Sequence, residues 1–191
     1  MAAVAQQKNV RLSDSAYTSC LLACRPDLSR AATEDACDVL QAVCELLYQL
    51  TSAHPGLVAS RAPLLVQGVE FVASELCPRS SQELARSPEE QAALVATANK
   101  LGRVVRELVQ LGPLTELLAP YLIADVLLQF QRTTLDHYVQ ESLTRSLYCL
   151  LTQCRDEVVT RLRVTLPPAT QHLFHTLFVN YKKFYKFAGR V

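Results

Sequence analysis

Apolar residues recur along this chain at spacings of three and four positions rather than two. One such stripe begins at Ala36 and continues through Leu40, Val43, Leu47 and Leu50. These spacings place apolar side chains on one face of an α-helix, whereas a half-buried strand would alternate apolar and polar residues. The pattern therefore predicts helices throughout the chain.

Local signals predict where the first of these helices begin and end. Thr33, followed by Glu34 and Asp35, is expected to cap the helix that carries the first stripe, since acids favour the positive end of a helix. The sequence His54-Pro55-Gly56 is expected to end that helix. A shorter helix is predicted from Pro63, in its first turn, to Cys77-Pro78.

A polar linker, residues 78–87, leads to the best-marked helix start in the chain. Ser87 can cap the helix, Pro88 suits its first position, and Glu90 completes a capping box. The helix is expected to end at Gly112-Pro113. Beyond it the pattern predicts helices over 117–131, 134–153, 156–164 and 168–187, with Pro120 opening the first and Thr134 and Thr170 as caps or near-caps.

Short connections between successive amphipathic helices favour antiparallel neighbours. The expected fold class is all-α, an array of antiparallel helical hairpins. The array would be either a HEAT- or armadillo-like solenoid fragment or an irregular helical bundle. Residues 1–82 are expected to form N-terminal helices, within the same array or as a separate layer, and residues 83–191 a C-terminal helical domain.

Composition narrows the class of protein. Half of the 191 residues are apolar and 19% are charged, which excludes an intrinsically disordered chain. The formal net charge of +1 excludes a polycation that coats nucleic acid over its whole surface. Met1 to Lys8 lack the apolar run of a signal peptide, and Glu116 and two prolines interrupt the longest nearly uncharged stretch, 108–123. We therefore expect no contact with a membrane.

The seven cysteines are expected to be reduced thiols, because their number is odd and no secretory signal precedes them. Cys20 and Cys24 lie four positions apart, and Cys37 and Cys44 seven, so each pair shares a helical face. Nothing near Cys20 and Cys24 completes the four ligands of a zinc site. The cysteines are therefore expected to pack in the core, as small apolar side chains do.

The sequence carries no motif typical of an enzyme: no glycine-rich phosphate loop, no His-Glu-x-x-His and no Gly-x-Ser-x-Gly. His172 and His175 could share a metal on one helix, but no carboxylate or thiol in that helix completes a site. A helical enzyme would need acids brought to these histidines by folding, in a polar pocket. We expect no catalytic residues, no cofactor, no metal and no small-molecule substrate.

The C-terminus combines aromatic and basic residues. Residues 132–191 hold 9 basic and 4 acidic side chains, and Phe178, Tyr181 and Tyr185 follow a helical stripe. Two interpretations are open: a face that binds RNA phosphates or an acidic partner, with aromatics stacking on bases, or a last helix whose aromatics anchor the core. The candidate binding residues are Tyr181, Lys182, Lys183, Tyr185, Lys186 and Arg190.

Three blocks in order resemble the C-terminal domain of a nucleolar ribosome-biogenesis scaffold, the family called "unhealthy ribosome biogenesis protein two". Ala119–Val126 resembles a helix opening with proline and an aromatic residue, and Leu143–Leu151 a central helix with a tyrosine among leucines. Leu166–Lys186 is similar to the closing helix, with Asn180-Tyr181 and the following aromatic and lysine residues. Ser146 departs from the pattern, since the family tends to have a glycine there.

The resemblance implies a non-enzymatic scaffold in the nucleus, in the nucleolus, that acts in large-subunit assembly and precursor-rRNA processing. It implies partners among other nucleolar assembly factors, a large helical scaffold and a DEAD-box helicase, in early large-subunit precursor particles, and precursor rRNA. The chain would be the C-terminal piece of a much larger helical protein. The alternative is a generic HEAT-like adaptor in cytoplasmic protein–protein assembly, which would share the fold.

Overall fold

A computed structural model describes residues 12–84 and 86–186 of the chain. Every named element in these two ranges is helical, and none of their residues forms a strand. This confirms the predicted all-α fold.

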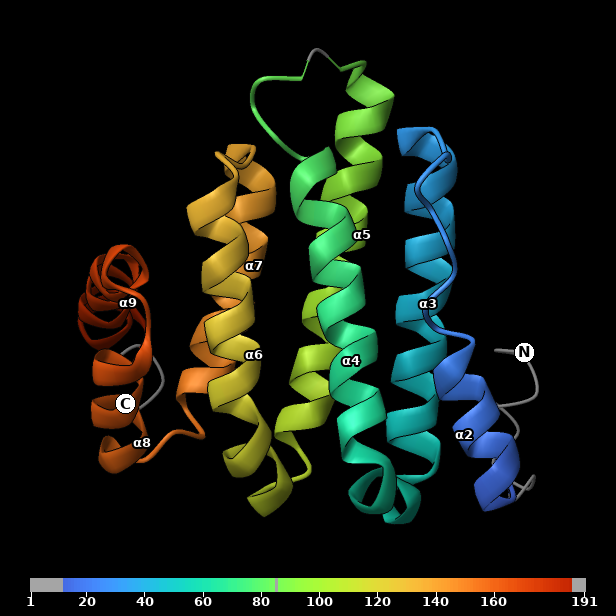
Figure 1. Cartoon of the computed structure of the whole chain (residues 1–191), viewed down its shortest axis with the longest axis horizontal. Helices are drawn as coiled ribbons and strands as arrows, with labels where there is room; N and C mark the ends of the chain where they lie inside the picture. The colour runs from blue at the N-terminus through green and yellow to red at the C-terminus, as the bar shows by residue number, and fades with distance from the viewer. Residues whose placement is uncertain (1–11, 85, 187–191) are drawn as a thin grey trace.

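The helices form two layers that alternate along the chain (Figure 1). In one layer α4 (Pro55–Arg79) packs between α2 (Asp14–Leu22) and α6 (Pro113–Arg132). The other layer contains α3 (Thr33–Ala53), α5 (Pro88–Val109) and α7 (His137–Leu151), with α5 in the middle. From α3 to α7, successive helices run in opposite directions. An open two-layer array of this kind is the arrangement of helical solenoids, one of the two predicted forms.

The C-terminal helices close one end of the array. Beyond α6 and α7 lie α8 (Asp156–Thr165), α9 (Pro168–Asn180) and the π-helical segment η1 (Tyr181–Tyr185) (Figure 1). Both α8 and α9 pack against α6, whereas η1 packs against α7. The end of the chain therefore bridges the two layers.

One continuous apolar core runs through the array. It includes Tyr17 near the N-terminus, Leu47 and Leu101 in the middle and Phe174 near the C-terminus, all almost fully buried. Helices on both sides of residue 82 contribute to it, since α3 packs mainly against α5 and α4 also packs against α6. The division of the chain at residue 82 stays a prediction.

Four of the seven cysteines lie in this core, as expected: Cys24, Cys37, Cys44 and Cys77. Cys20, Cys149 and Cys154 are half-buried, and none of the seven forms a disulfide. Burial raises the pKa of Cys24, Cys44 and Cys77 to about 12. These thiols therefore stay protonated at neutral pH, and a protonated thiol is a poor nucleophile and metal ligand.

Three predicted boundaries agree with the structure. The Ser87 hydroxyl accepts the backbone N–H of Glu90, and the Glu90 carboxylate accepts the N–H of Ser87, so the capping box is confirmed. The helix α3 ends before His54 as predicted, and a short helical segment that was not predicted begins immediately at Pro55. A kink at Arg61, whose φ of −124° and ψ of 16° are not helical, separates this segment from the rest of α4, which carries Pro63 in its first turn as predicted.

Two further helix starts were predicted too far along the chain. Thr33 is the first residue of α3 rather than its cap, and the residue before it, Ala32, makes no side-chain cap. Pro120 does not open its helix, because α6 begins at Pro113. Gly112 has a φ of +61°, a conformation that glycine adopts without strain, and this lets the helix start directly after it.

The two predicted threonine caps also have other roles. Asp136, rather than Thr134, caps α7, and its carboxylate accepts the N–H groups of Tyr138 and Val139. Thr170 is buried in the first turn of α9, where its hydroxyl donates to the side chain of Gln131 on α6. An aspartate carboxylate accepts two N–H groups where a threonine hydroxyl two residues earlier cannot reach.

Two helices, α4 and α6, are long and apolar enough to cross a membrane by length and composition alone. A core helix of a soluble protein passes the same test, and α4 packs against α2, α3, α5 and α6. The expectation that the chain contacts no membrane stays a prediction.

Candidate functional site

The candidate binding residues at the C-terminus lie on two different sides of η1. Tyr181, Lys182, Lys183, Tyr185 and Lys186 are described by the structure, whereas Arg190 lies outside the described residues. Tyr181 is buried against the array, Tyr185 contacts α7 but is 37% exposed, and the lysines are exposed. The tyrosines therefore make the contacts with α7, whereas the lysines lie in solvent.

The tyrosines join η1 to α7. Tyr181 is 5% exposed, and its ring centroid lies 5.9 Å from that of Tyr148 on α7. The ring of Tyr185 lies 5.3 Å from that of Tyr148. Phe174 and Phe178 continue the row of rings along α9. These distances are typical of stabilising aromatic pairs, so the row holds the last helix on the array.

The π-helical winding of η1 places these tyrosines. The N–H of Lys186 donates to the carbonyl oxygen of Tyr181, 2.9 Å away and five residues back. Such a turn contains one residue more than an α-helical turn and is frequent at functional sites. Here it turns both Tyr181 and Tyr185 toward Tyr148 while the lysines stay outside.

The tyrosine hydroxyls stay protonated at neutral pH. Burial raises the pKa of Tyr148 and of Tyr181. A hydrogen bond with the Cys149 thiol, together with burial, raises the pKa of Tyr185 to about 12. None of the three can therefore supply a phenolate at neutral pH, and their chemistry is that of packing.

Cations from two helices meet at the outer side of this end. The ammonium nitrogen of Lys182 lies 4.8 Å from the ring centroid of Phe178, and the guanidinium carbon of Arg163, on α8, lies 4.9 Å from the same centroid. Lys183 lies 4.9 Å from the ring of Phe184, which is 62% exposed. We call Arg163, Lys182, Lys183 and Lys186 the basic surface. Within residues 12–84 and 86–186, none of the four forms an ion pair.

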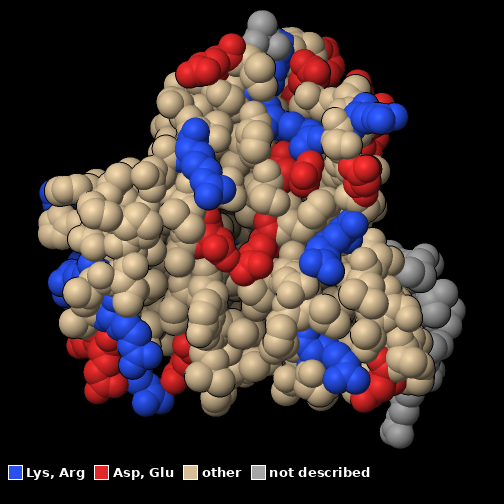
Figure 2. Space-filling model, in the orientation of Figure 1, with Lys and Arg blue, Asp and Glu red and all other residues tan. Residues whose placement is uncertain are grey.

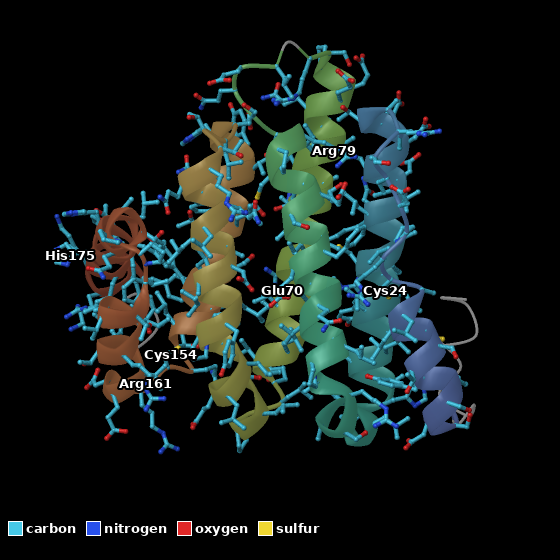
Figure 3. All side chains as sticks on the ribbon, viewed as in Figure 1. Cys24, Glu70, Arg79, Cys154, Arg161 and His175 are labelled. Atoms are coloured by element: carbon cyan, nitrogen blue, oxygen red, sulfur yellow. The ribbon has the colours of Figure 1, made fainter. Side chains whose placement is uncertain are left out.

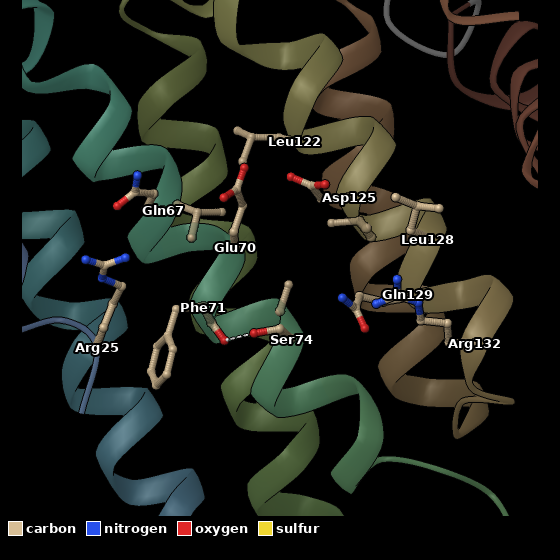
Figure 4. Close-up of a pocket in the computed structure, with 13 residues that line it drawn as sticks. Arg25, Gln67, Glu70, Phe71, Ser74, Leu122, Asp125, Leu128, Gln129 and Arg132 are labelled. Carbon is tan, nitrogen blue, oxygen red and sulfur yellow. Dashed lines mark hydrogen bonds between the residues drawn. The ribbon is translucent and has the colours of Figure 1, made fainter. Parts of the chain in front are cut away.

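A groove of about 390 Å³ between α4 and α6 is a second candidate site. Figure 2 shows a hollow near the centre of this face, with acidic side chains along it and basic ones on either side. Glu70 from α4 and Asp125 from α6 point toward one another across it (Figure 4). Arg25 and Arg132 lie farther out along the groove.

The two carboxyl groups in this groove interact unfavourably when both are charged. Burial, a hydrogen bond with Asp125 and the charge of Asp125 raise the pKa of Glu70 to about 7. A carboxyl group whose pKa is near 7 can gain or lose a proton at neutral pH, so Glu70 is a candidate acid or base. In the described part of the chain, however, no group of three His, Cys, Asp or Glu side chains could hold a metal ion. Two carboxylates alone fall short of the three or four protein ligands typical of such sites.

The sequence held only a weak signal for this pair. Glu70 interrupts the apolar stretch 64–72 and Asp125 the stretch 122–128. A single acid within an apolar helical segment is unusual, because burial of an unpaired charge is costly. The alternation of layers, which brings α4 beside α6, could not be read from either segment.

The two histidines considered as metal ligands lie away from this groove. His172 and His175 are exposed on α9, and His175 lies at the outer end of the array (Figure 3). Neither lines the groove that contains Glu70 and Asp125. Folding therefore does not bring that carboxyl pair to the histidines.

Comparison with known protein families matches residues 1–190 to the Urb2/Npa2 family. The match includes residues 1–119, which precede the three blocks that carry the resemblance. No solved structure matches the chain.

Proposed function

Since the chain belongs to the Urb2/Npa2 family of ribosome-biogenesis factors, we propose that it is a non-enzymatic scaffold in the nucleolus. It acts there in assembly of the large ribosomal subunit and processing of its precursor RNA. The two-layer array supports a scaffold role, because open helical arrays offer long surfaces for partners. Other nucleolar assembly factors, including a large helical scaffold and a DEAD-box helicase, are its proposed protein partners.

The basic surface is the proposed contact with precursor RNA. Its four cations come from two helices, are exposed at their charged ends and have no carboxylate partner within the described residues. Lysine and arginine side chains free of internal ion pairs bind phosphate groups and release their counterions. This gathering of unpaired cations is the observation that carries the proposal.

Phe184 adds a second element to this surface. Its side chain is 62% exposed, more than that of Tyr185 at 37%, and it lies beside Lys183. An exposed ring next to a cation can stack on a base while the cation binds the neighbouring phosphate. In contrast, the rings of Tyr181 and Tyr185 already pack against the ring of Tyr148. Single-stranded RNA is therefore the ligand that this surface fits best.

Charge reversal at two lysines tests the RNA contact. Lys182→Glu with Lys183→Glu should weaken binding to single-stranded RNA at least about tenfold and reduce the salt slope by roughly 1.4, as expected for two lost phosphate contacts. Arg30→Glu with Arg132→Glu changes the net charge equally at exposed positions elsewhere. Equal losses in the two variants would show a nonspecific charge effect and contradict the proposal.

Recovery with precursor particles tests the scaffold role in cells. A tagged copy should locate to the nucleolus and co-purify with large-subunit precursors. The lysine variant should do so less, provided that its circular dichroism spectrum and melting temperature are unchanged. A diffuse cytoplasmic distribution would favour the generic helical adaptor instead.

A further inference from the structure

A second groove lies between α6 and α8, on a part of the surface that the basic surface does not use. Its volume is about 310 Å³. Most of its wall is apolar: Leu117, Pro120, Tyr121 and Ala124 from α6, with Val158 and Leu162 from α8. We call it the α6–α8 groove. A volume of this size accommodates a few side chains of a partner, since ligand pockets begin at about 300 Å³.

The α6 side of the groove exposes large apolar side chains. Leu117 is 69% exposed and Tyr121, one helical turn later, is 66% exposed. The main core of the array does not need them, because Ala119, Leu122 and Ile123 form the buried face of the same helix. Adjacent exposed apolar groups that line a groove mark an interaction site more often than scattered ones do.

The charges of the groove favour an acidic partner. Glu116 is already neutralised by Arg155, whose guanidinium nitrogen lies 2.9 Å from its carboxylate. Arg161 lines the groove from α8 (Figure 3) and has no carboxylate within 4.0 Å in the described part of the chain. The unbalanced charge of the groove is therefore positive.

We propose that the α6–α8 groove binds an amphipathic helical segment of a partner protein. Two large apolar side chains of that segment, one turn apart, would pack against Leu117 and Tyr121. An aspartate or glutamate beside them would pair with Arg161. Helix-in-groove recognition uses apolar anchors at this spacing. A few anchor residues near the centre of an interface carry most of its binding energy.

A protein segment fits this groove better than a nucleotide does. Most of its wall consists of aliphatic side chains from both helices. Besides Arg161, its polar groups are the hydroxyls of Tyr121 and Thr165 and the already paired Glu116. Recognition of a base requires a flat stacking surface and partners for its hydrogen-bonding edge. Only Tyr121 offers a flat surface on which a base could stack. The aliphatic side chains offer no hydrogen-bond partners for the edge of a base.

The proposal does not depend on the RNA contact proposed above. The basic surface lies on α8 and the last helical segment, and the variants that test it leave Leu117, Tyr121 and Arg161 unchanged. Loss of one activity with retention of the other would therefore identify which proposal has failed.

Selection from a peptide library tests the groove with a defined probe. The full chain is immobilised and exposed to a phage-displayed library of random peptides of about 12 residues, three helical turns. The selected peptides should contain two large apolar residues one turn apart and an aspartate or glutamate. Nuclear magnetic resonance should show shifts at Leu117, Tyr121 and Arg161 when such a peptide is added.

Three variants decide the outcome. Leu117→Ala with Tyr121→Ala should weaken binding of the selected peptides at least about tenfold, whereas Tyr138→Ala, at an exposed tyrosine of α7, should leave it unchanged. Arg161→Glu should shift a repeated selection from acidic to basic peptides. Since these residues are exposed, all variants should keep the melting temperature of the wild type.

Three results would overturn the proposal. One is a selection that yields no peptide whose binding depends on Leu117 and Tyr121. Another is an unchanged charge preference in Arg161→Glu. The third is displacement of the peptide by single-stranded oligouridine, which would assign the groove to RNA.

Discussion

The hydroxyl oxygen of Tyr185 lies 3.3 Å from the sulfur of Cys149, across the contact between η1 and α7. Together with the tilted contact between the rings of Tyr148 and Tyr185, this hydrogen bond holds the last described turn of the chain against the array. Because the Tyr185 hydroxyl titrates, the contact can be followed in solution.

Removal of Cys149 should lower the pKa of Tyr185. In the folded protein the hydrogen bond with Cys149, and secondly burial, raise this pKa from 10 to about 12. The folded state therefore holds the proton more tightly than the unfolded state, and stability should fall as pH rises from 10 to 12. In an alkaline spectrophotometric titration, Tyr185→Phe should lose a phenolate with a midpoint near 12, and Cys149→Ala should move that midpoint toward 10. An identical midpoint with and without the thiol would contradict this.

Truncation of Tyr181 should destabilise the end of the array. The side chain is 5% exposed and contacts Phe178, Tyr148 and Tyr185. Tyr181→Ala should lower the free energy of unfolding by about 3 kcal/mol, as large-to-small changes in a core do. Phe184→Ala, at an exposed ring of the same segment, should cost less than about 0.5 kcal/mol. Urea denaturation followed by circular dichroism measures both, and equal losses would place Tyr181 outside the core.

The Glu70–Asp125 pair should make stability depend on pH. The pKa of Glu70 is raised to about 7 in the folded protein, from 4.5, by burial and by Asp125. The folded state therefore binds the proton more tightly than the unfolded state. The contribution of Glu70 to stability should be fully present below pH 4.5 and should be lost as pH rises to 7.

Glu70→Gln should remove this dependence. At pH 8 the variant should be more stable than the wild type by about 1 kcal/mol, since solvent screening reduces the effect of a partly exposed charge. The difference should shrink as pH falls toward 4.5. Glu83→Gln, at an exposed glutamate outside the groove, is the control. A variant that loses stability at pH 8 would show that the Glu70 carboxylate is needed there.

Gly102 and Ser146 should behave as a coupled pair. A Cβ atom at Gly102, on α5, would lie 2.9 Å from the Ser146 hydroxyl oxygen on α7. Gly102→Ala should therefore destabilise the fold by about 1 kcal/mol, although alanine favours helices. In the Ser146→Ala background the cost should disappear, which a double-mutant cycle measures. Additive effects would show that α5 and α7 adjust without strain.

The same pair shows how α5 accommodates Ser146, the residue at which the resemblance predicts a departure from the family pattern. Its hydroxyl packs against Gly102, which has no side chain, and donates to the carbonyl oxygen of Ser142. The facing helix thus provides the space that the larger residue needs.

The local parts of the fold could be predicted from the sequence. The capping box at Ser87 has all of its groups within four residues, so the sequence specifies it completely. The start of α6 was missed, because Pro113 and Pro120 both suit a first turn and only the positive φ of Gly112 decides between them. The local sequence predicts Thr170 as a cap or near-cap, whereas its hydroxyl partner, Gln131, comes from another helix.

The candidate site could be predicted only in part, because it too depends on contacts between different helices. The composition of the last helix indicated lysines and aromatics, and two of the lysines lie on the basic surface beside aromatic rings. Which aromatics face solvent depends on Tyr148, a residue of α7. Glu70 and Asp125 meet because α4 and α6 are neighbours in one layer, a relationship that no segment of sequence contains.

The extra residue in the π-helical turn sets the angular position of Tyr185 relative to Tyr181. Removing one residue between them would restore ordinary α-helical winding and rotate Tyr185 by about 100° about the helix axis. The Tyr185 ring would then turn away from Tyr148, and its hydroxyl would lose its hydrogen bond with the Cys149 thiol. A one-residue deletion here should therefore be more damaging than any single substitution in the same five positions.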